Sequence, residues 1–250
     1  MHDIPMEERL DKILIQRGLI STRVRAEKMI LETGVKVAGK LINKPGKKFP
    51  IDIDIEMLAE EIPWVSRGAF KLLQALDTWK IDVTGLTAID LGASTGGFTE
   101  VLLSKGIEKV FCVDVGTNQL HPSIKSNPKV VDISKTHIRE LTKHHVPTLV
   151  DLVVIDVSFI SLEKVIPFIH PFLKEGGQLI TLVKPQFEVG KENISKGGIV
   201  KNQQLYPTVL ENIKKVGELC NLVSQGHIDS PILGGDGNKE FLMWLIKKPL

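Results

Sequence analysis

Four short apolar runs, separated by helix-like segments, constrain the fold of this 250-residue chain more than any other feature. They lie at residues 86–91, 110–115, 150–157 and 179–183. Strands that alternate with helices form a mostly parallel sheet with helices on both faces. A helix expected at residues 204–220, followed by Ile228 and an apolar run at residues 241–246, indicates a closing hairpin with an antiparallel last strand. The sequence therefore predicts an α/β fold with a Rossmann-like sheet.

A smaller α+β domain is expected before this sheet. Apolar residues at helical spacing predict a first helix at residues 8–17, and Ser21 is the expected cap of a second helix that ends at Gly34. Alternating apolar residues then indicate short strands, namely Val35, Val37, Leu41, Ile42, Ile51, Ile53 and Ile55. The expected boundaries are residues 1–60 for this domain, 61–65 for a linker and 66–250 for the larger domain.

Basic side chains are concentrated in the smaller domain. The formal net charge of the chain is only +2, but residues 9–48 hold eleven Lys and Arg against three acidic residues. Such an excess is typical of a phosphate-binding surface, although an ordinary solvated face explains it equally well. The candidate residues for nucleic-acid contact are Arg9, Arg23, Arg25, Lys28, Lys36, Lys40 and, in the larger domain, Arg67.

Composition disfavours several other classes of protein. The chain has two cysteines, so a disulfide framework or a paired metal motif is not expected, and a reducing cytoplasm suits it. Cys112 falls inside an expected strand, which disfavours a cysteine nucleophile. His144 and His145 have no evident metal-ligand partners, so no metal is expected. The sequence contains no apolar run of about 20 residues, the length that a membrane helix requires, and we expect a cytoplasmic protein without membrane partners.

A glycine-rich turn follows the first strand of the predicted sheet. Its candidate cofactor-binding residues are Asp90, Gly92, Ala93, Ser94, Thr95, Gly96, Gly97, Phe98 and Thr99. Glycines let the backbone approach a ligand, and the free N–H groups of the next helix face it. The second strand ends in Asp114 and Val115, where a carboxylate can bind ribose hydroxyls. Because the turn lacks G-x-G-x-x-G and an acidic residue precedes it, S-adenosylmethionine is favoured over the alternative, a nicotinamide cofactor.

Four ionisable residues are expected near the same edge of the sheet. Asp156 and Lys184 end two parallel strands, and Glu240 begins the antiparallel one. Asp156 is also a candidate cofactor-binding residue. Lys71, expected on the polar face of a helix at residues 66–79, would add a second cation. A hydroxyl acceptor must lose its proton, and a lysine removes it only where burial or a neighbouring cation lowers the lysine pKa from about 10.4. Each residue taken singly also has an ordinary structural explanation.

Together these motifs resemble the TlyA family, the haemolysin-A-like ribosomal RNA 2'-O-ribose methyltransferases related to FtsJ. The runs that carry the resemblance are RLD at 9–11, RGL at 17–19, WVSRG at 64–68, LGASTGGFT at 91–99, DVSFISL at 156–162, VKPQFEVG at 183–190 and GNKEF at 237–241. The resemblance implies an RNA-binding domain like that of ribosomal small-subunit protein four, followed by a methyltransferase domain. It also implies a catalytic tetrad at Lys71, Asp156, Lys184 and Glu240, with S-adenosylmethionine as the donor and a cytidine ribose of ribosomal RNA, free or in a subunit, as the acceptor.

Two segments depart from the family pattern. Residues 115–119 read VGTNQ where the family has VGYGQ, and residues 134–137 read SKTH where it has ERTN. Both flank the expected adenosine, so the adenine contacts are the least defined part of the site. The short carboxyl end mildly favours large-subunit RNA as the acceptor. Two alternatives stay open, a haemolysin-like membrane-active protein and an inactive RNA-binding or assembly factor.

Overall fold

The computed structural model describes residues 7–59 and 63–249. The chain divides into two units, Met1–Pro63 and Trp64–Leu250, called here the amino-terminal and carboxyl-terminal domains. Residues 60–62, which include part of the predicted linker, lie outside the described residues, as do residues 1–6 and 250. The predicted boundaries of the linker therefore stay a prediction.

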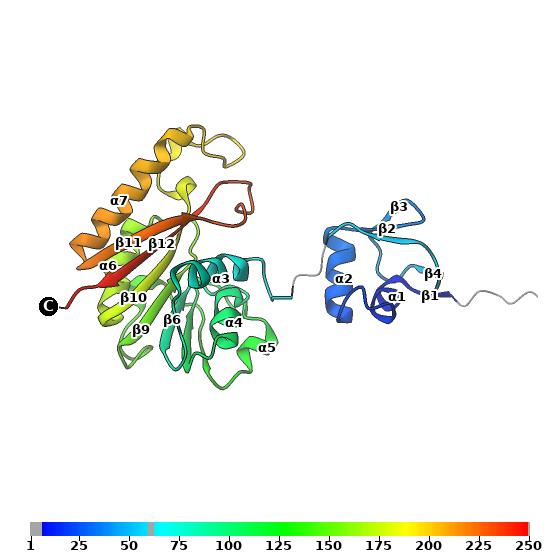
Figure 1. Cartoon of the computed structure of the whole chain (residues 1–250), viewed down its shortest axis with the longest axis horizontal. Coiled ribbons are helices and arrows are strands. Elements are labelled where there is room, and N and C mark those ends of the chain that lie inside the picture. Colours follow the sequence, from blue (N-terminus) through cyan, green and yellow to red (C-terminus); the bar gives the residue numbers. More distant parts are fainter. Residues whose placement is uncertain (1–6, 60–62, 250) are drawn as a thin grey trace, which may run out of the picture. The chain divides into compact units, whose positions relative to one another are not determined.

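The amino-terminal domain packs two helices against short strands (Figure 1). Its elements are β1 Glu7–Arg9, α1 Leu10–Gln16, α2 Arg23–Glu32, β2 Val35–Val37, β3 Lys40–Ile42, β4 Lys48–Pro50 and β5 Ile55–Met57. Strand β1 pairs with β4, and the other three form a sheet in the order β3-β2-β5. Its core consists of Leu10, Leu14, Ile20, Ala26, Ile30, Val35, Val37 and Ile42.

Two details of this domain differ from the sequence predictions. The cap of α2 is Thr22 and not Ser21, because the Thr22 side chain accepts the hydrogen bond from the backbone N–H of Arg25. Ile51 and Ile53 lie in a turn, closed by the bond from Ile53 N to Pro50 O, and the strand begins only at Ile55. The alternation of isoleucines therefore spans a turn and one strand.

The carboxyl-terminal domain alternates strands and helices. Its helices and strands are α3 Gly68–Trp79, β6 Thr87–Leu91, α4 Gly97–Ser104, β7 Lys109–Val113, α5 Pro122–Lys125, β8 Val130–Ile133, β9 Val150–Ile155, α6 Ile166–Ile169, β10 Leu173–Val183, α7 Tyr206–Leu219, β11 Leu222–Asp229 and β12 Phe241–Lys247. Its 3-10 turns are η1 Ile138–Glu140, η2 Leu162–Lys164, η3 His170–Phe172, η4 Pro185–Phe187, η5 Lys191–Asn193 and η6 Gln203–Leu205.

The seven strands of this domain form one sheet in the order β11-β12-β10-β9-β6-β7-β8 (Figure 1). The five strands from β10 to β8 are parallel, and β12 is antiparallel to both β10 and β11. The prediction of a mostly parallel sheet with an antiparallel last strand is therefore confirmed.

Side chains of the central strands alternate between two buried faces. Ile89 and Leu91 of β6 belong to the core that includes residues of α6 and α7, whereas Ala88 packs in the core that includes residues of α3 and α4. Because helices cover both faces, these strands read as continuous apolar runs in the sequence. In the sheet, β6 lies between β7, the next strand in the chain, and β9, a later strand. Ligands of open α/β sheets bind at such a switch point, outside the carboxyl ends of the strands.

We expect Leu152→Ala to destabilise the carboxyl-terminal domain by about 2–5 kcal/mol, because it removes a fully buried side chain from the centre of β9. The matched control is Leu219→Ala at the end of α7, where the leucine is 87% exposed and the change should stay within about 0.5 kcal/mol. All three tryptophans lie in this domain, so their fluorescence during urea unfolding follows it. Equal effects of the two substitutions would contradict the assigned core.

Candidate active site

A cleft opens at the carboxyl ends of β6 and β9. Its volume is about 160 Å³. It is lined by Ser66, Gly68, Lys71, Asp90, Gly92, Ala93, Ser94, Thr95, Gly97, Phe98 and Asp156. Seven of the candidate cofactor-binding residues of the glycine-rich turn, together with two of the four candidate catalytic residues, thus share one cavity. Ser66 and Gly68 were not predicted as site residues, although both belong to the WVSRG run.

The glycine-rich turn is shaped by a close approach of two backbones. Gly92 has a φ of 82°, and a Cβ atom there would lie 2.3 Å from the carbonyl oxygen of Asp156. Gly97, at the start of α4, approaches Ser66, whose Oγ would lie 2.1 Å from an added Cβ. Neither position can hold a side chain without a shift of its neighbours. The turn therefore presents bare backbone to the cleft.

Asp114 holds the other side of this turn. Its carboxylate accepts hydrogen bonds from the backbone N–H groups of Ser94 at 2.8 Å and Gly116 at 2.7 Å. Each carboxylate oxygen has a second lone pair, so Asp114 keeps the capacity to bind ribose hydroxyls. The neighbouring Val115 is 67% exposed and does not line the cleft. The remaining candidates, Gly96 and Thr99, are buried behind the turn.

Asp90 is a buried carboxyl group beneath the turn. Its Oδ2 accepts a hydrogen bond of 2.6 Å from the Thr99 hydroxyl, while Oδ1 has no partner among the described residues. Burial, opposed by the Thr99 hydrogen bond and assisted by the charge of Asp156, raises the pKa of Asp90 from 3.8 to about 7. An unpartnered buried oxygen in a cleft wall fits a ligand that carries a hydrogen-bond donor or a cation.

Cys112 lies behind Thr99, in the middle of β7. Its Sγ is 3.1 Å from the Thr99 hydroxyl, and burial raises the pKa of its thiol. A buried thiol of raised pKa is inert, so the structure agrees with the expectation that Cys112 is no nucleophile.

The four candidate catalytic residues form two ion pairs. Lys71 Nζ lies 2.6 Å from Glu240 Oε2, and both side chains are buried. Lys184 Nζ lies 2.7 Å from Asp156 Oδ1 and donates a hydrogen bond of 2.8 Å to the Ser158 hydroxyl. The cleft wall contains one member of each pair, Lys71 and Asp156.

The predicted environment of Lys71 was wrong. The helical spacing placed it on a polar face, but its side chain is buried in the described structure. The reason is the carboxylate of Glu240, which meets the amine across 169 residues of sequence and compensates the cost of burying it. Lys184 pairs with Asp156, the residue that follows the neighbouring strand β9.

The loop before β12 fixes the position of Glu240. A Cβ atom added to Gly234 would lie 2.5 Å from Glu240 Oε1, and Gly234 N donates to the carbonyl of Asn238. The buried Asn238 side chain accepts from Val200 N and donates to Gly198 O. These supporting residues were missed in the sequence, where only the GNKEF run pointed to this loop.

Comparison with known proteins connects the site to a family. Residues 64–247 match the FtsJ-like methyltransferase model, and residues 8–50 match the S4 domain. The chain is 39% identical over 238 residues to the 16S/23S rRNA (cytidine-2'-O)-methyltransferase TlyA of Mycobacterium tuberculosis, covering 95% of this chain and 89% of that protein. The chain belongs to the TlyA family.

Other relatives of this TlyA-family chain are named either as rRNA methyltransferases or as hemolysins. The 23S rRNA (cytidine-2'-O)-methyltransferase TlyA of Campylobacter jejuni is 34% identical over 78% of this chain and 75% of its own length. Hemolysin A of Brachyspira hyodysenteriae is 35% identical over 95% of this chain and 99% of its own. Among solved structures, a candidate hemolysin of Streptococcus thermophilus matches with a TM-score of 0.75 at 37% identity, covering 98% of this chain and 90% of that one. No helix in the described part of the TlyA-family chain is long and apolar enough to cross a membrane.

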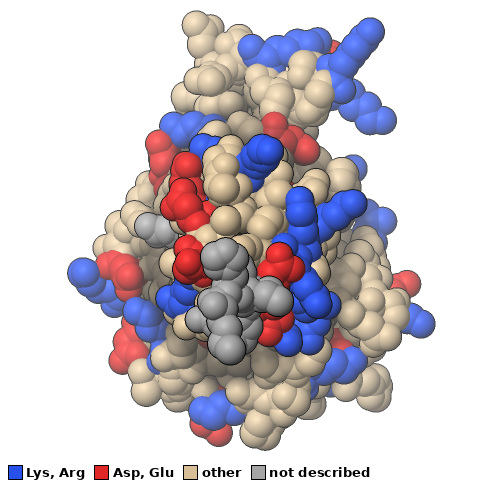
Figure 2. Space-filling view, turned by 90° about the vertical axis from the view of Figure 1, so that its right-hand side faces the viewer, with Lys and Arg blue, Asp and Glu red and all other residues tan. Residues whose placement is uncertain are grey.

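The candidate RNA-binding cations of the TlyA-family chain are not equally available. Arg9 and Arg23 contact Asp11 and Glu27, and Lys36 lies 3.0 Å from Glu56. Lys28 and Lys40 are exposed and have no ion pair with a described acidic residue, and Arg67 is exposed at the start of α3. Figure 2 shows acidic side chains interspersed among Lys and Arg on the face turned to the viewer. The basic excess counted in the sequence is therefore partly neutralised locally.

We expect Asp90→Asn to stabilise the TlyA-family chain increasingly as the pH rises from 4 to 7. A carboxyl group whose pKa is higher in the folded than in the unfolded protein does not affect stability at a pH where it is protonated in both. It destabilises the folded protein most at a pH above its folded-state pKa. The difference between 3.8 and about 7 corresponds to about 4 kcal/mol at most.

The measurement is the free energy of unfolding of the wild type and Asp90→Asn between pH 4 and 8. The difference between them should grow up to about pH 7 and then level off, because all other groups titrate alike in both proteins. A difference that stays constant from pH 4 to 7 would show that Asp90 titrates normally.

Proposed function

We propose that this protein transfers a methyl group from S-adenosylmethionine to the ribose 2'-hydroxyl of a cytidine in ribosomal RNA. The observation that carries the proposal is the Lys184–Asp156 ion pair of 2.7 Å beside a cleft whose other wall is a glycine-rich turn. Relatives that cover most of this chain are named as rRNA cytidine-2'-O-methyltransferases.

The donor fits the residues of the cleft. The bare backbone at Gly92 and Gly97 would admit its methionine end, and Asp114 would accept its ribose hydroxyls. The unpartnered Oδ1 of Asp90 offers an acceptor to a donor group at the base of the cleft. When bound, the donor supplies a methyl group on a positively charged sulfur, which is open to attack by an oxygen nucleophile.

Lys184 and Asp156 would act on the acceptor. A ribose hydroxyl becomes a nucleophile when its proton is removed, and in-line transfer requires close positioning of the two reactants. The Lys184 amine, held by Asp156 and Ser158, would bind the 2'-hydroxyl and would take its proton after passing one of its own protons to Asp156. Glu240 would hold the amine of Lys71, the second lysine of the cluster, in place. The cluster then contains two lysines and two carboxylates.

The amino-terminal domain would supply RNA affinity. It matches the S4 domain, and its candidate contacts are the basic residues Arg9, Arg23, Arg25, Lys28, Lys36 and Lys40, with Arg67 near the cleft. We place the protein with this substrate in the cytoplasm. A haemolysin-like activity is favoured only by the names of some relatives, and an inactive assembly factor would bind RNA without transferring a methyl group.

The test of the proposal is methyl transfer from labelled donor to 16S and 23S ribosomal RNA, free and in subunits. A 2'-O-methylated nucleotide resists alkaline cleavage on its 3' side, so the label should appear in an alkali-resistant dinucleotide that contains cytidine. Label on a base, or no transfer at all to any of these acceptors, would overturn the proposal.

We expect Lys184→Ala to abolish this transfer, with the fold and most of the donor affinity preserved, because the side chain acts on the acceptor hydroxyl. The matched control is Lys174→Ala, which removes a similar lysine from a 2.6 Å pair with Asp151 near the start of the same strand. Transfer by the control variant should stay close to that of the wild type. Near-normal turnover by Lys184→Ala would remove Lys184 from the chemistry.

We expect Gly92→Ala to weaken binding of S-adenosylhomocysteine, measured by calorimetry, by about tenfold or more. The added methyl group would collide with the Asp156 backbone at a positive φ. Gly176→Ala is the control, because Gly176 also has a positive φ, of 72°, but has open space around it. NAD should not bind to the wild type. Unchanged affinity in Gly92→Ala, or binding of NAD in place of S-adenosylhomocysteine, would contradict the assigned cofactor loop.

A further inference from the structure

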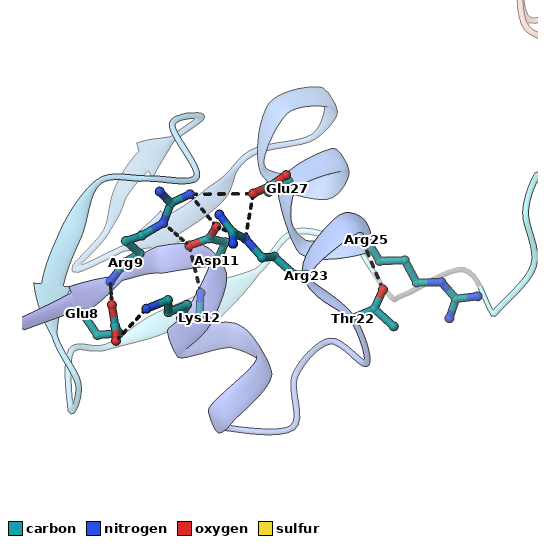
Figure 3. Close-up of polar contacts among 8 residues, drawn as sticks. All are labelled: Glu8, Arg9, Asp11, Lys12, Thr22, Arg23, Arg25 and Glu27. Atoms are coloured by element: carbon teal, nitrogen blue, oxygen red, sulfur yellow. Dashed lines mark hydrogen bonds and ion pairs between the residues drawn. The ribbon is translucent and has the colours of Figure 1, made fainter. Parts of the chain in front are cut away.

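A buried carboxylate lies between two arginines in the amino-terminal domain (Figure 3). Arg9 donates to Asp11 through Nε at 3.0 Å and through Nη2 at 2.7 Å, a two-point contact. Arg23 donates from Nε to Asp11 Oδ2 at 3.3 Å. Asp11 is 0% exposed, and the hydrogen bonds from Arg9 are the main cause of its lowered pKa. The carboxylate is therefore ionised at neutral pH and joins the residue before α1 to the first residue of α2.

Each arginine keeps hydrogen-bond donors that the acids do not use. A guanidinium has five N–H donors in a planar fork. Among the described residues, nothing accepts from Nη1 of Arg9 or from either terminal nitrogen of Arg23. The side chains of Arg9 and Arg23 are 34% and 54% exposed. Donors of this kind suit the oxygens of a phosphate group.

The net charge of this cluster cannot explain binding to an anion. Arg9 and Arg23 are balanced by Asp11 and by Glu27, whose Oε1 lies 3.0 Å from Arg23 Nε and 3.7 Å from Arg9 Nη2. The four charges sum to zero. Binding of a phosphate here must come from the orientation of the two guanidinium groups, and the half-buried Glu27 would repel the phosphate.

We propose that Asp11 is a positioning residue, which fixes the guanidinium groups of Arg9 and Arg23 so that their unused N–H groups bind one phosphate of the RNA backbone. This inference rests on the proposed function, in which the amino-terminal domain contacts RNA. It assigns opposite effects to two carboxylates that touch the same arginines. Asp11 supports the phosphate site, and Glu27 opposes it.

A pair of charge-matched variants separates positioning from plain electrostatics. Asp11→Asn and Glu27→Gln both raise the net charge by one, so long-range attraction alone makes both bind RNA more tightly. If Asp11 positions the arginines, Asp11→Asn binds about tenfold more weakly, because the phosphate loses an oriented charge-assisted hydrogen bond. Glu27→Gln binds equally or more tightly.

The probe is a mixed-sequence RNA duplex, and its affinity for the full chain is measured by fluorescence anisotropy at several salt concentrations. Asp11→Asn should also show a shallower dependence of affinity on salt, because fewer phosphates are neutralised. Binding of S-adenosylhomocysteine should be equal in all variants. Amide NMR spectra of the full chain report whether the amino-terminal domain is folded, since no tryptophan lies in it.

Arg9→Lys keeps the inference testable if Asp11→Asn does not fold. It preserves the charge and a partner for Asp11 but removes the planar guanidinium group, so it should also weaken RNA binding. Folded Asp11→Asn that binds RNA as tightly as the wild type or more tightly overturns the proposal, as does unimpaired Arg9→Lys. If these variants bind normally while the wild type methylates ribosomal RNA, only this inference fails. If the wild type neither binds nor methylates RNA, the proposed function fails with it.

Discussion

The contact between Gly92 and the backbone of Asp156 is the constraint on which the site depends. The bond of 2.9 Å from Asp156 N to Leu91 O continues the pairing of β6 and β9 one residue beyond the end of β9. At Gly92 the two segments come too close for a side chain. The glycine-rich turn and the loop with the candidate catalytic residue Asp156 are thereby brought to one edge of the cleft. Lys184 follows the neighbouring strand β10, and Glu240 precedes β12, so both reach this edge through the order of the strands.

The ionisable groups at this edge differ in whether they have a partner of opposite charge. Lys71 with Glu240, and Lys184 with Asp156, are paired one to one, because an unpaired charge in a poorly hydrated site is costly. Among the described residues, Asp90 has no cationic partner and is hydrogen-bonded only by Thr99, so burial raises its pKa to about 7. This edge therefore combines two ion pairs of candidate catalytic residues with one carboxyl group, Asp90, whose pKa lies near neutral pH.

Charged side chains of the amino-terminal domain are also held in ion pairs. Its excess of basic residues is visible in the sequence, but Asp11 and Glu27 hold two of the arginines, and Glu56 holds Lys36. Because paired cations attract RNA weakly at long range, geometry matters more here than net charge. Counting charges along the chain could not distinguish Asp11, a buried acid that contacts two arginines, from Glu27, a half-buried acid beside the same arginines.

Periodicity and motifs in the sequence were sufficient for the α/β sheet, its antiparallel last strand, the glycine-rich turn and the four ionisable positions, because each of these depends on local pattern. Tertiary structure alone decided which charges meet. Lys71 looked like a surface residue because helical spacing cannot reveal a carboxylate 169 positions away, and the partner of Lys184 depends on how β9, β10 and β12 lie side by side. Likewise, Asp11 looked like any helical acid until folding placed the start of α2 against it, since burial of a charge is a property of packing and not of sequence.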